Sequence, residues 1–138
     1  MRLTRRYRFS ASHRLHSDEL TEAQNDATYG KCNNPYGHGH NYVLEVTVRG
    51  TVDPVTGRVH DLPALDEFVT QEIVSRYDHR NLNKQVPELA GLVPTTEVVS
   101  AVIHARLEAG WPQQWPVLDR VRIWETRNNI FEVSKEIQ

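Results

Sequence analysis

The chain has 138 residues, which is the size of one ordinary domain, and we treat residues 1–138 as a single unit. Hydrophobic residues make up 38% and charged residues 25%, and no apolar run is long enough to span a membrane, so we expect a globular protein without membrane segments. The formal net charge of −2 argues against general nucleic-acid binding.

The N-terminus and the cysteine content favour a cytoplasmic protein. Residues 1–7 lack the apolar core of a secretory signal, so we expect no secretory peptide. The single cysteine, Cys32, cannot form an intrachain disulfide. A free thiol without a secretion signal is typical of a reducing compartment.

The first predicted strand covers residues 3–13. Apolar side chains and His13 share one parity and polar side chains share the other, except for Arg5, which is typical of a half-buried strand. Residues 14–37 are polar and rich in Asn and Gly, which predicts a long loop of the kind that often carries function. Basic residues gather in residues 1–31; a solvated strand face is the simpler explanation, and a site for an anionic ligand is the alternative.

The second predicted strand covers residues 38–52 and begins with His38 and His40 on its buried parity. Two side chains at this spacing on a strand point to the same side. Residues 53–57 predict a turn, and residues 58–62 could form a short strand end. We expect the two long strands to be neighbours in a sheet.

Two helices follow. Pro63 suits the first position of a helix that ends near residues 76–77. Thr95, followed by Glu97 in the first turn, predicts the start of a second helix, and Gly110 suits its C-terminal end.

Two further strands are predicted at residues 117–126 and 130–134. The order strand-strand-helix-helix-strand-strand predicts an α+β fold, a four-stranded antiparallel sheet with two helices on one face. Such a sheet has two open edges, and subunits that join into a barrel would protect them.

A metal site is predicted where the strands end. His13, His38 and His40 supply three imidazoles, a set that suits zinc and leaves one coordination position open. Cys32 lies six residues before His38. It could be the fourth ligand of a closed structural site, or a reactive thiol whose pKa a nearby cation lowers.

Two acidic positions are further candidates. Asp78 can set the tautomer of the adjacent His79, and both would assist Cys32 in removing a proton if they lay near it; otherwise they form an ordinary polar loop. Glu125 shares the parity of apolar strand residues, so it either faces inward or lies where the strand end curls into solvent. A buried carboxylate there could accept two hydrogen bonds from a pterin or guanine ring.

At these residues the chain resembles the 6-pyruvoyl-tetrahydropterin synthase family over nearly its whole length. The matching segments are residues 9–15, 32–42, 53–57, 78–83, 95–97 and 124–129. The resemblance implies an enzyme that converts 7,8-dihydroneopterin triphosphate to 6-pyruvoyl-tetrahydropterin with elimination of triphosphate, in a pathway of the tetrahydrobiopterin type.

The resemblance also implies the roles of the candidate residues. His13, His38 and His40 match the zinc ligands of the family, and Cys32 matches its proton-transfer base, with Asp78 and His79 assisting. Glu125 matches the acid that anchors the pterin ring, with Thr95 and Thr96 nearby. Magnesium is associated with activity. The implied tunnelling fold assembles as a homohexamer, a dimer of trimers, whose sites are built from more than one subunit.

Two other functions are compatible with the sequence. Relatives of the queuosine pathway make 6-carboxy-tetrahydropterin, and their cysteine usually lies four residues before the first histidine of the pair. The six-residue separation of Cys32 and His38 favours the pyruvoyl reaction. From a different class, a zinc-stabilised binding module would use Cys32 to complete a site with three histidines.

Overall fold

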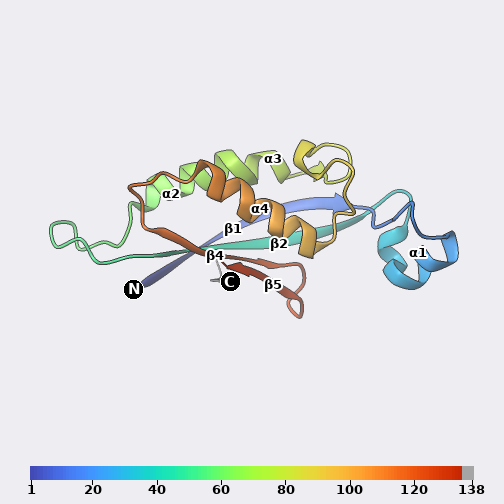
Figure 1. Cartoon of the computed structure of the whole chain (residues 1–138), viewed down its shortest axis with the longest axis horizontal. Coiled ribbons are helices and arrows are strands. Elements are labelled where there is room, and N and C mark those ends of the chain that lie inside the picture. The colour runs from blue at the N-terminus through green and yellow to red at the C-terminus, as the bar shows by residue number, and fades with distance from the viewer. Residues whose placement is uncertain (135–138) are drawn as a thin grey trace.

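A computed structural model describes residues 1–134 as a five-stranded sheet covered by helices on one face (Figure 1). The strand order is β3-β1-β2-β4-β5. β3 runs parallel to β1, and all other neighbours are antiparallel. The strand bounds are β1 Arg2–His13, β2 His38–Arg49, β3 Arg80–Asn81, β4 Val117–Trp124 and β5 Ile130–Ser134.

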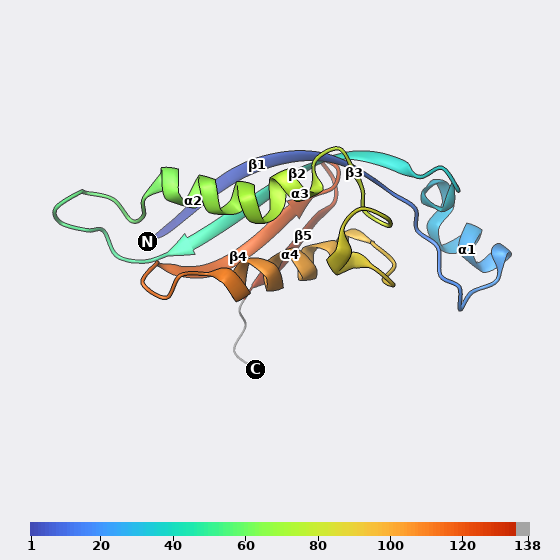
Figure 2. The same cartoon turned by 90° about the horizontal axis from the view of Figure 1, so that it is seen from above.

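The helices that cover the sheet form two rods. The first contains α2 (Leu62–Val69), a π-helical segment (Thr70–Val74) and α3 (Ser75–Tyr77), and it lies along β1; α4 (Thr96–Gly110) lies along β4 (Figure 2). Both predicted helices are therefore confirmed. Asp61 caps α2 and Thr95 caps α4, each accepting a hydrogen bond from a backbone N–H of the first turn.

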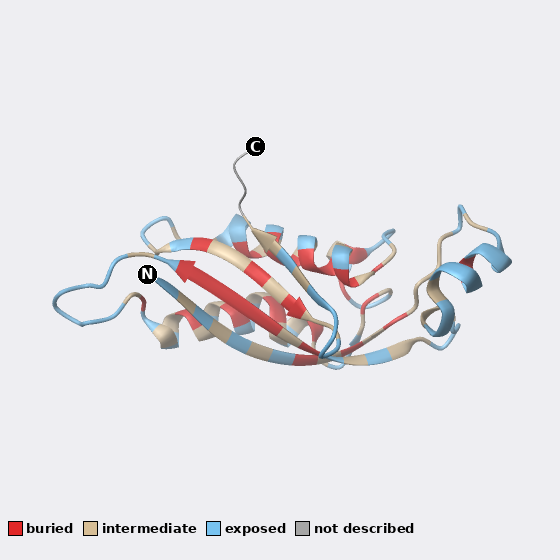
Figure 3. Cartoon of the chain, turned by 90° about the horizontal axis from the view of Figure 1, so that it is seen from below, coloured by how far each residue is buried: buried red, intermediate tan, exposed pale blue. Residues whose placement is uncertain are grey.

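The core lies between the sheet and the two rods, as Figure 3 indicates by burial. The predicted alternation of β1 is confirmed, because Phe9, Ala11 and His13 are all buried on one face. β2 is the most buried strand, and its core side chains belong to the same hydrophobic cluster as those of α2 and α4. The fully buried residues of these three elements include Tyr42, Leu44, Val46, Leu65, Val69, Val99, Ile103 and Leu107.

The prediction of a four-stranded, wholly antiparallel sheet was wrong in one respect. β3 adds a fifth strand beside Ala11 and Ser12 of β1, and it is parallel. It contains two residues in a polar segment, so it has no alternating apolar pattern that sequence inspection could detect. Backbone hydrogen bonds hold it, from His79 N to Ser10 O at 2.6 Å and from Leu82 N to Ser12 O at 2.8 Å.

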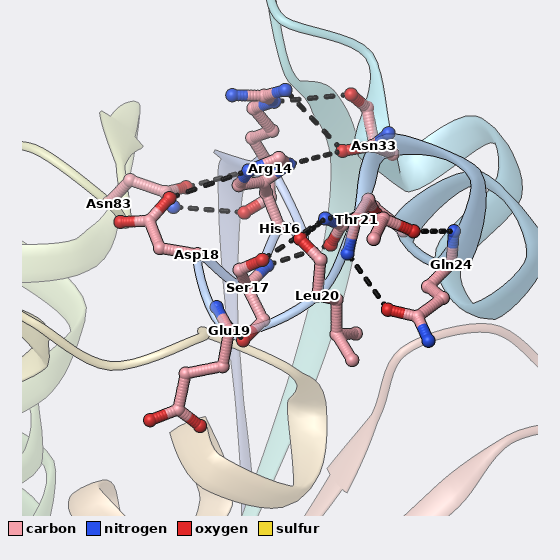
Figure 4. A network of polar contacts seen from close by, with 11 residues as sticks. Arg14, His16, Ser17, Asp18, Glu19, Leu20, Thr21, Gln24, Asn33 and Asn83 are labelled. Atoms are coloured by element: carbon pink, nitrogen blue, oxygen red, sulfur yellow. Dashed lines mark hydrogen bonds and ion pairs between the residues drawn. The ribbon is translucent and has the colours of Figure 1, made fainter.

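The predicted loop of residues 14–37 contains α1 (Glu22–Tyr29) and a 3₁₀ segment (Gly30–Asn33), which project beyond the end of the sheet (Figure 1). α1 buries little apolar surface, so periodicity does not reveal it. A capping box starts it, in which Thr21 Oγ1 accepts from Gln24 N at 3.1 Å and Gln24 Oε1 accepts from Thr21 N at 2.9 Å (Figure 4).

Two element boundaries also differ from prediction. The second strand ends at Arg49 rather than at residue 52, and residues 58–62 form a bend and the cap of α2 rather than a strand end. Pro63 lies in the first turn of α2, where its fixed φ suits a helix and its missing N–H leaves no hydrogen bond unmade. No helix among residues 1–134 combines the length and the apolar character that crossing a bilayer demands.

Candidate active site

The three predicted metal ligands gather at one end of the β1–β2 pair. The register places His13 opposite His38 and Ala11 opposite His40, so all three histidines lie within three consecutive rungs of the strand pair. The ring centroids of His13 and His40 are 4.9 Å apart, and those of His38 and His40 are 4.7 Å apart. The alternation of two strands thus brings together imidazoles from distant parts of the sequence.

His13 is held in one tautomer. Its side chain is fully buried, and Nδ1 lies 2.9 Å from the carbonyl oxygen of Pro94. A carbonyl only accepts, so Nδ1 must carry the proton and Nε2 must present its lone pair. Nε2 of His13 and Nε2 of His40 are both buried and have no hydrogen-bond partner among the described residues. An unpaired buried nitrogen is costly unless a ligand binds it.

Cys32 lies beside these nitrogens. The ligand atoms of His13, Cys32 and His40 all lie within 4.8 Å of one another. Cys32 belongs to the 3₁₀ segment, and its carbonyl accepts from Leu15 N at 2.6 Å, which joins the two ends of the predicted loop. The structure therefore brings Cys32 to the histidines, while His38 lies beside His40 and outside this tightest group.

Burial controls the protonation of this group. It lowers the pKa of His13 and of His40, against the smaller opposing effect of the Glu125 carboxylate. It raises the pKa of the Cys32 thiol, and the charge of Glu125 raises it further. The histidines therefore favour their neutral, ligating form, whereas the thiol keeps its proton unless a cation is nearby.

Glu125 follows the last residue of β4 and faces the site. The hydroxyl of Thr96 donates to its carboxylate, and Thr96 is only 1% exposed. Of the two readings of Glu125, this contact favours the inward one. Thr95 lies next to Thr96, but its hydroxyl oxygen accepts from Val98 N at 3.2 Å as the cap of α4.

Asp78 and His79 lie on the other side of β1, next to β3. Asp78 Oδ1 accepts from Ser10 N at 2.8 Å, and Asp78 Oδ2 lies 3.5 Å from His79 Nε2. His79 has a positive φ of 58°, a conformation that few residues other than glycine adopt. No hydrogen bond or ion pair within residues 1–134 joins either side chain to Cys32. Within one chain, Asp78 therefore lies beside His79, but the predicted relay of these two residues with Cys32 is not formed.

Two contributors to the site escaped the sequence prediction. The Pro94 carbonyl that orients His13 is 81 positions away from it, and a backbone oxygen carries no residue-specific signal. Asn83 clamps the chain directly after His13, since its Oδ1 accepts from Arg14 N at 2.7 Å and its Nδ2 donates to Arg14 O at 2.9 Å (Figure 4). The only sequence signal for this clamp was the pair of asparagines at 81 and 83, because asparagine side chains often form hydrogen bonds with backbone groups.

The donor set fits a metal ion. It offers two buried imidazole nitrogens without partners, a thiol beside them, and His38 as a further imidazole. Neutral imidazole and thiolate are the ligands that zinc prefers in proteins. The Pro94 carbonyl on Nδ1 of His13 is the outer hydrogen bond that metal-binding histidines almost always make.

The lowered histidine pKa values predict how the stability of the metal-free protein depends on pH. As pH falls below the ordinary histidine pKa of about 6.5, the unfolded chain takes up protons before folded His13 and His40 do. Their contribution to the free energy of unfolding is full above about pH 6.5 and is lost as pH falls through the lowered folded values.

Urea unfolding with a chelator present, at pH values on both sides of 6.5, measures how steeply the free energy of unfolding changes with pH. His40→Gln should reduce this slope, and an unchanged slope would contradict the assignment.

The fold and the site together define a class: an α+β protein with a group of two histidines and a cysteine that could hold a metal ion, and with an adjacent carboxylate, at the end of its sheet. The family model described as 6-pyruvoyl tetrahydropterin synthase matches residues 2–136. This chain is 48% identical to the 6-pyruvoyl tetrahydrobiopterin synthase of Poecilia reticulata, over 93% of this chain and 86% of that protein. It is 46% identical to the one of Homo sapiens, over 97% and 91%.

The fold comparison agrees. The structure of Caenorhabditis elegans 6-pyruvoyl tetrahydropterin synthase matches with a TM-score of 0.89 and 42% identity, covering 99% of this chain and 96% of that one. The chain belongs to the 6-pyruvoyl tetrahydropterin synthase family.

Proposed function

We propose that the protein converts 7,8-dihydroneopterin triphosphate to 6-pyruvoyl-tetrahydropterin and inorganic triphosphate. The observation that carries the proposal is the meeting of His13, Cys32 and His40 within 4.8 Å, in a chain of this family. The six-residue separation of Cys32 and His38 favours the pyruvoyl product over the carboxy product of related enzymes.

His13, His38 and His40 would hold a zinc ion. Bound there, zinc would supply Lewis-acid polarisation of a substrate side-chain oxygen. The histidines themselves fix the geometry: the Pro94 carbonyl orients His13, and His40 lies two rungs along the β1–β2 ladder, opposite Ala11. Magnesium is proposed as a further ion required for activity, associated with the phosphate groups of the substrate.

Cys32 would act as the general base. Its thiolate takes the proton from the side-chain carbon of the substrate, and the C–O bond to the triphosphate breaks with its electron pair leaving on the phosphate oxygen. The resulting enol tautomerises to one ketone. The remaining CH–OH carbon becomes the second ketone as its two hydrogens pass by tautomerisation to the C=N bond of the dihydropterin ring, so the ring is reduced to the tetrahydro level and no external oxidant is needed. Since burial raises the pKa of the thiol, the base form depends on positive charge nearby.

Glu125 would anchor the pterin ring, supported by Thr96 and with Thr95 nearby. Replacing Glu125 by Gln removes the charge and one acceptor, so we expect pterin binding to weaken by roughly 10- to 100-fold, the value of a charge-assisted hydrogen bond. Equilibrium binding of a reduced pterin without phosphates is the measurement. The surface variant Glu19→Gln is the matched control, and equal affinity of the Glu125 variant and wild type would remove the anchoring role.

The relay of Cys32 with Asp78 and His79 is proposed to form between subunits of a hexamer, a dimer of trimers. Two observations support an assembly: β3 covers only Ala11 and Ser12 of β1, and β5 ends the sheet on the other side, so both edges offer unpaired backbone. Closing these edges gives the barrel of the tunnelling fold. Mixing inactive Cys32→Ala and His79→Ala subunits should restore part of the activity, and mixtures that stay inactive would place the whole relay in one chain.

The activity test is direct. Purified, zinc-loaded protein is incubated with dihydroneopterin triphosphate and Mg²⁺, and the products are identified by mass. The pyruvoyl product together with inorganic triphosphate is the expected result. The carboxy product would assign the chain to the other reaction, and no turnover with zinc bound would favour a binding module.

A further inference from the structure

A cavity of about 530 Å³ opens next to the metal-ligating group, between α1 and the start of β2. His38 forms part of its wall, and so do Arg14, His16 and Lys31 from the segment before β2. Its size lies within the range of roughly 300–1,000 Å³ that is typical of small-molecule sites. Apart from His38, no residue of its lining has a role proposed above.

Arg14 is the most informative residue of the cavity wall. It is half-buried, and its guanidinium donates only to neutral groups: Nε to Asn33 O at 3.1 Å, and a second nitrogen to Asn33 Oδ1 at 3.4 Å (Figure 4). In residues 1–134, every other half-buried arginine pairs with a carboxylate; these are Arg5, Arg76, Arg106, Arg120 and Arg122. Arg14 therefore holds a positive charge without a counter-ion.

The position of Arg14 is fixed on both sides. Asn83 clamps its backbone through both amide atoms, and Asn33 holds its side chain. His16 Nδ1 lies 3.0 Å from the same Asn33 side-chain oxygen, and Lys31 reaches the cavity from the 3₁₀ segment. A pre-positioned guanidinium with a lysine nearby is an arrangement that recognises phosphate groups.

Two carboxylates, Glu22 and Asp26, also line the cavity. Asp26 Oδ1 accepts from Asn33 Nδ2 at 2.7 Å, so its charge lies close to the residue that holds Arg14. The negative charge of these carboxylates would weaken the binding of an anion in the cavity. Removing one of the two charges should therefore strengthen that binding.

We infer that this cavity binds the triphosphate end of the substrate, with Arg14 as its principal contact and Lys31 as the second. The inference rests on the proposed function. The order of groups along the sheet supports it. β4 ends at Trp124, opposite Val43 of β2, so Glu125 lies farther along β2 than His40, whereas the cavity begins at His38, the first residue of β2. A ring anchored at Glu125 would extend its side chain past the histidines and its phosphates toward Arg14.

The first experiment measures binding of inorganic triphosphate to zinc-loaded protein by calorimetry, with zinc content followed because triphosphate also chelates zinc. Arg14→Gln should weaken binding by roughly 10- to 100-fold, and Lys31→Gln, which changes an exposed side chain, by less. Arg58→Gln is the matched control, an exposed arginine in the loop between β2 and α2 that does not line this cavity, and should change affinity by less than about twofold. If the Arg14→Gln and Arg58→Gln variants lost triphosphate affinity equally, the loss would reflect only the change in net charge, and the inference would be overturned.

Asp26→Asn provides a test in the opposite direction. Asparagine retains an oxygen that can accept from Asn33 Nδ2 but removes the negative charge, so triphosphate should bind more tightly by roughly two- to fivefold. A tighter complex with Asp26→Asn and a weaker one with Arg14→Gln cannot both result from general unfolding. Unchanged binding in both variants would overturn the inference.

Kinetics separate this inference from the proposed function. With dihydroneopterin triphosphate, Arg14→Gln should raise KM more than it lowers kcat. If the wild type forms the pyruvoyl product and Arg14→Gln has the same KM and kcat, the cavity assignment fails and the function stands. If the wild type forms no product but binds triphosphate through Arg14, the function fails and the anion site stands.

Discussion

Cys32→Ala is expected to abolish turnover while the protein stays folded and keeps its zinc. A positioned general base contributes about 10²- to 10⁴-fold to a rate, and alanine has no group that can accept the proton. Zinc should remain, because His13, His38 and His40 would still supply three imidazoles. The proximity of the three ligand atoms makes this variant the sharpest test of whether the thiol is a base or a ligand.

Three measurements decide the result for Cys32: zinc stoichiometry of the purified variant, its unfolding transition, and single-turnover rates. Cys32→Ser is the companion variant, because it keeps the shape of the side chain but is a much poorer base. Loss of zinc in both variants would make Cys32 a structural ligand. Turnover at the wild-type rate in the alanine variant would exclude Cys32 from the chemistry.

His40→Gln is expected to lose zinc and activity together. Loss of an outer hydrogen-bonding partner of a metal ligand already costs about 10- to 100-fold in metal affinity, so loss of a ligand should cost more than about 100-fold. The Nε2 of His40 is buried and has no hydrogen-bond partner within residues 1–134, and glutamine has no imidazole nitrogen to take its place as a ligand.

His60→Gln is the matched control for the metal prediction. His60 is also buried, with an unpaired Nε2, but its ring packs on Trp115 and it belongs to no group of potential ligands among the described residues. Competition with a chromophoric chelator gives the zinc affinity of each variant. Equal affinities for His40→Gln and wild type would refute the assignment of the site.

Alternation and helix-start signals sufficed to predict the parts of the fold that have a regular pattern. β1 and β2 alternate over their length, and that parity placed His13 on the buried face and His38 and His40 on the same side. Pro63 and Thr95 signalled the two helix starts, and Thr95 is the cap of α4, whereas the Asp61 cap of α2 was not predicted. For Glu125 the sequence left the inward and the solvent-facing alternatives open, and only its contact with Thr96 favours the inward one.

The rest of the site depends on contacts that no local pattern encodes. The partner of His13 is a backbone oxygen of Pro94, and β3 is held by backbone hydrogen bonds to Ser10 and Ser12 rather than by its side chains. The position of Cys32 depends on how the segment that contains α1 folds back, through the bond between Leu15 and Cys32. The relay to Asp78 and His79 remains a prediction, because it would form between subunits.

The register places His13 and His38 on the terminal rung of the β1–β2 ladder, and His40 two rungs further in, opposite Ala11. Ladder ends open most readily, so amide hydrogens there exchange with solvent faster than those in the middle of the strands. An ion held by both strands would close that end, and its binding free energy would be added to the local opening free energy. Loading with zinc should therefore slow deuterium uptake around residues 11–13 and 38–41, and leave the opposite end of the hairpin, near Arg2 and Arg49, exchanging as before.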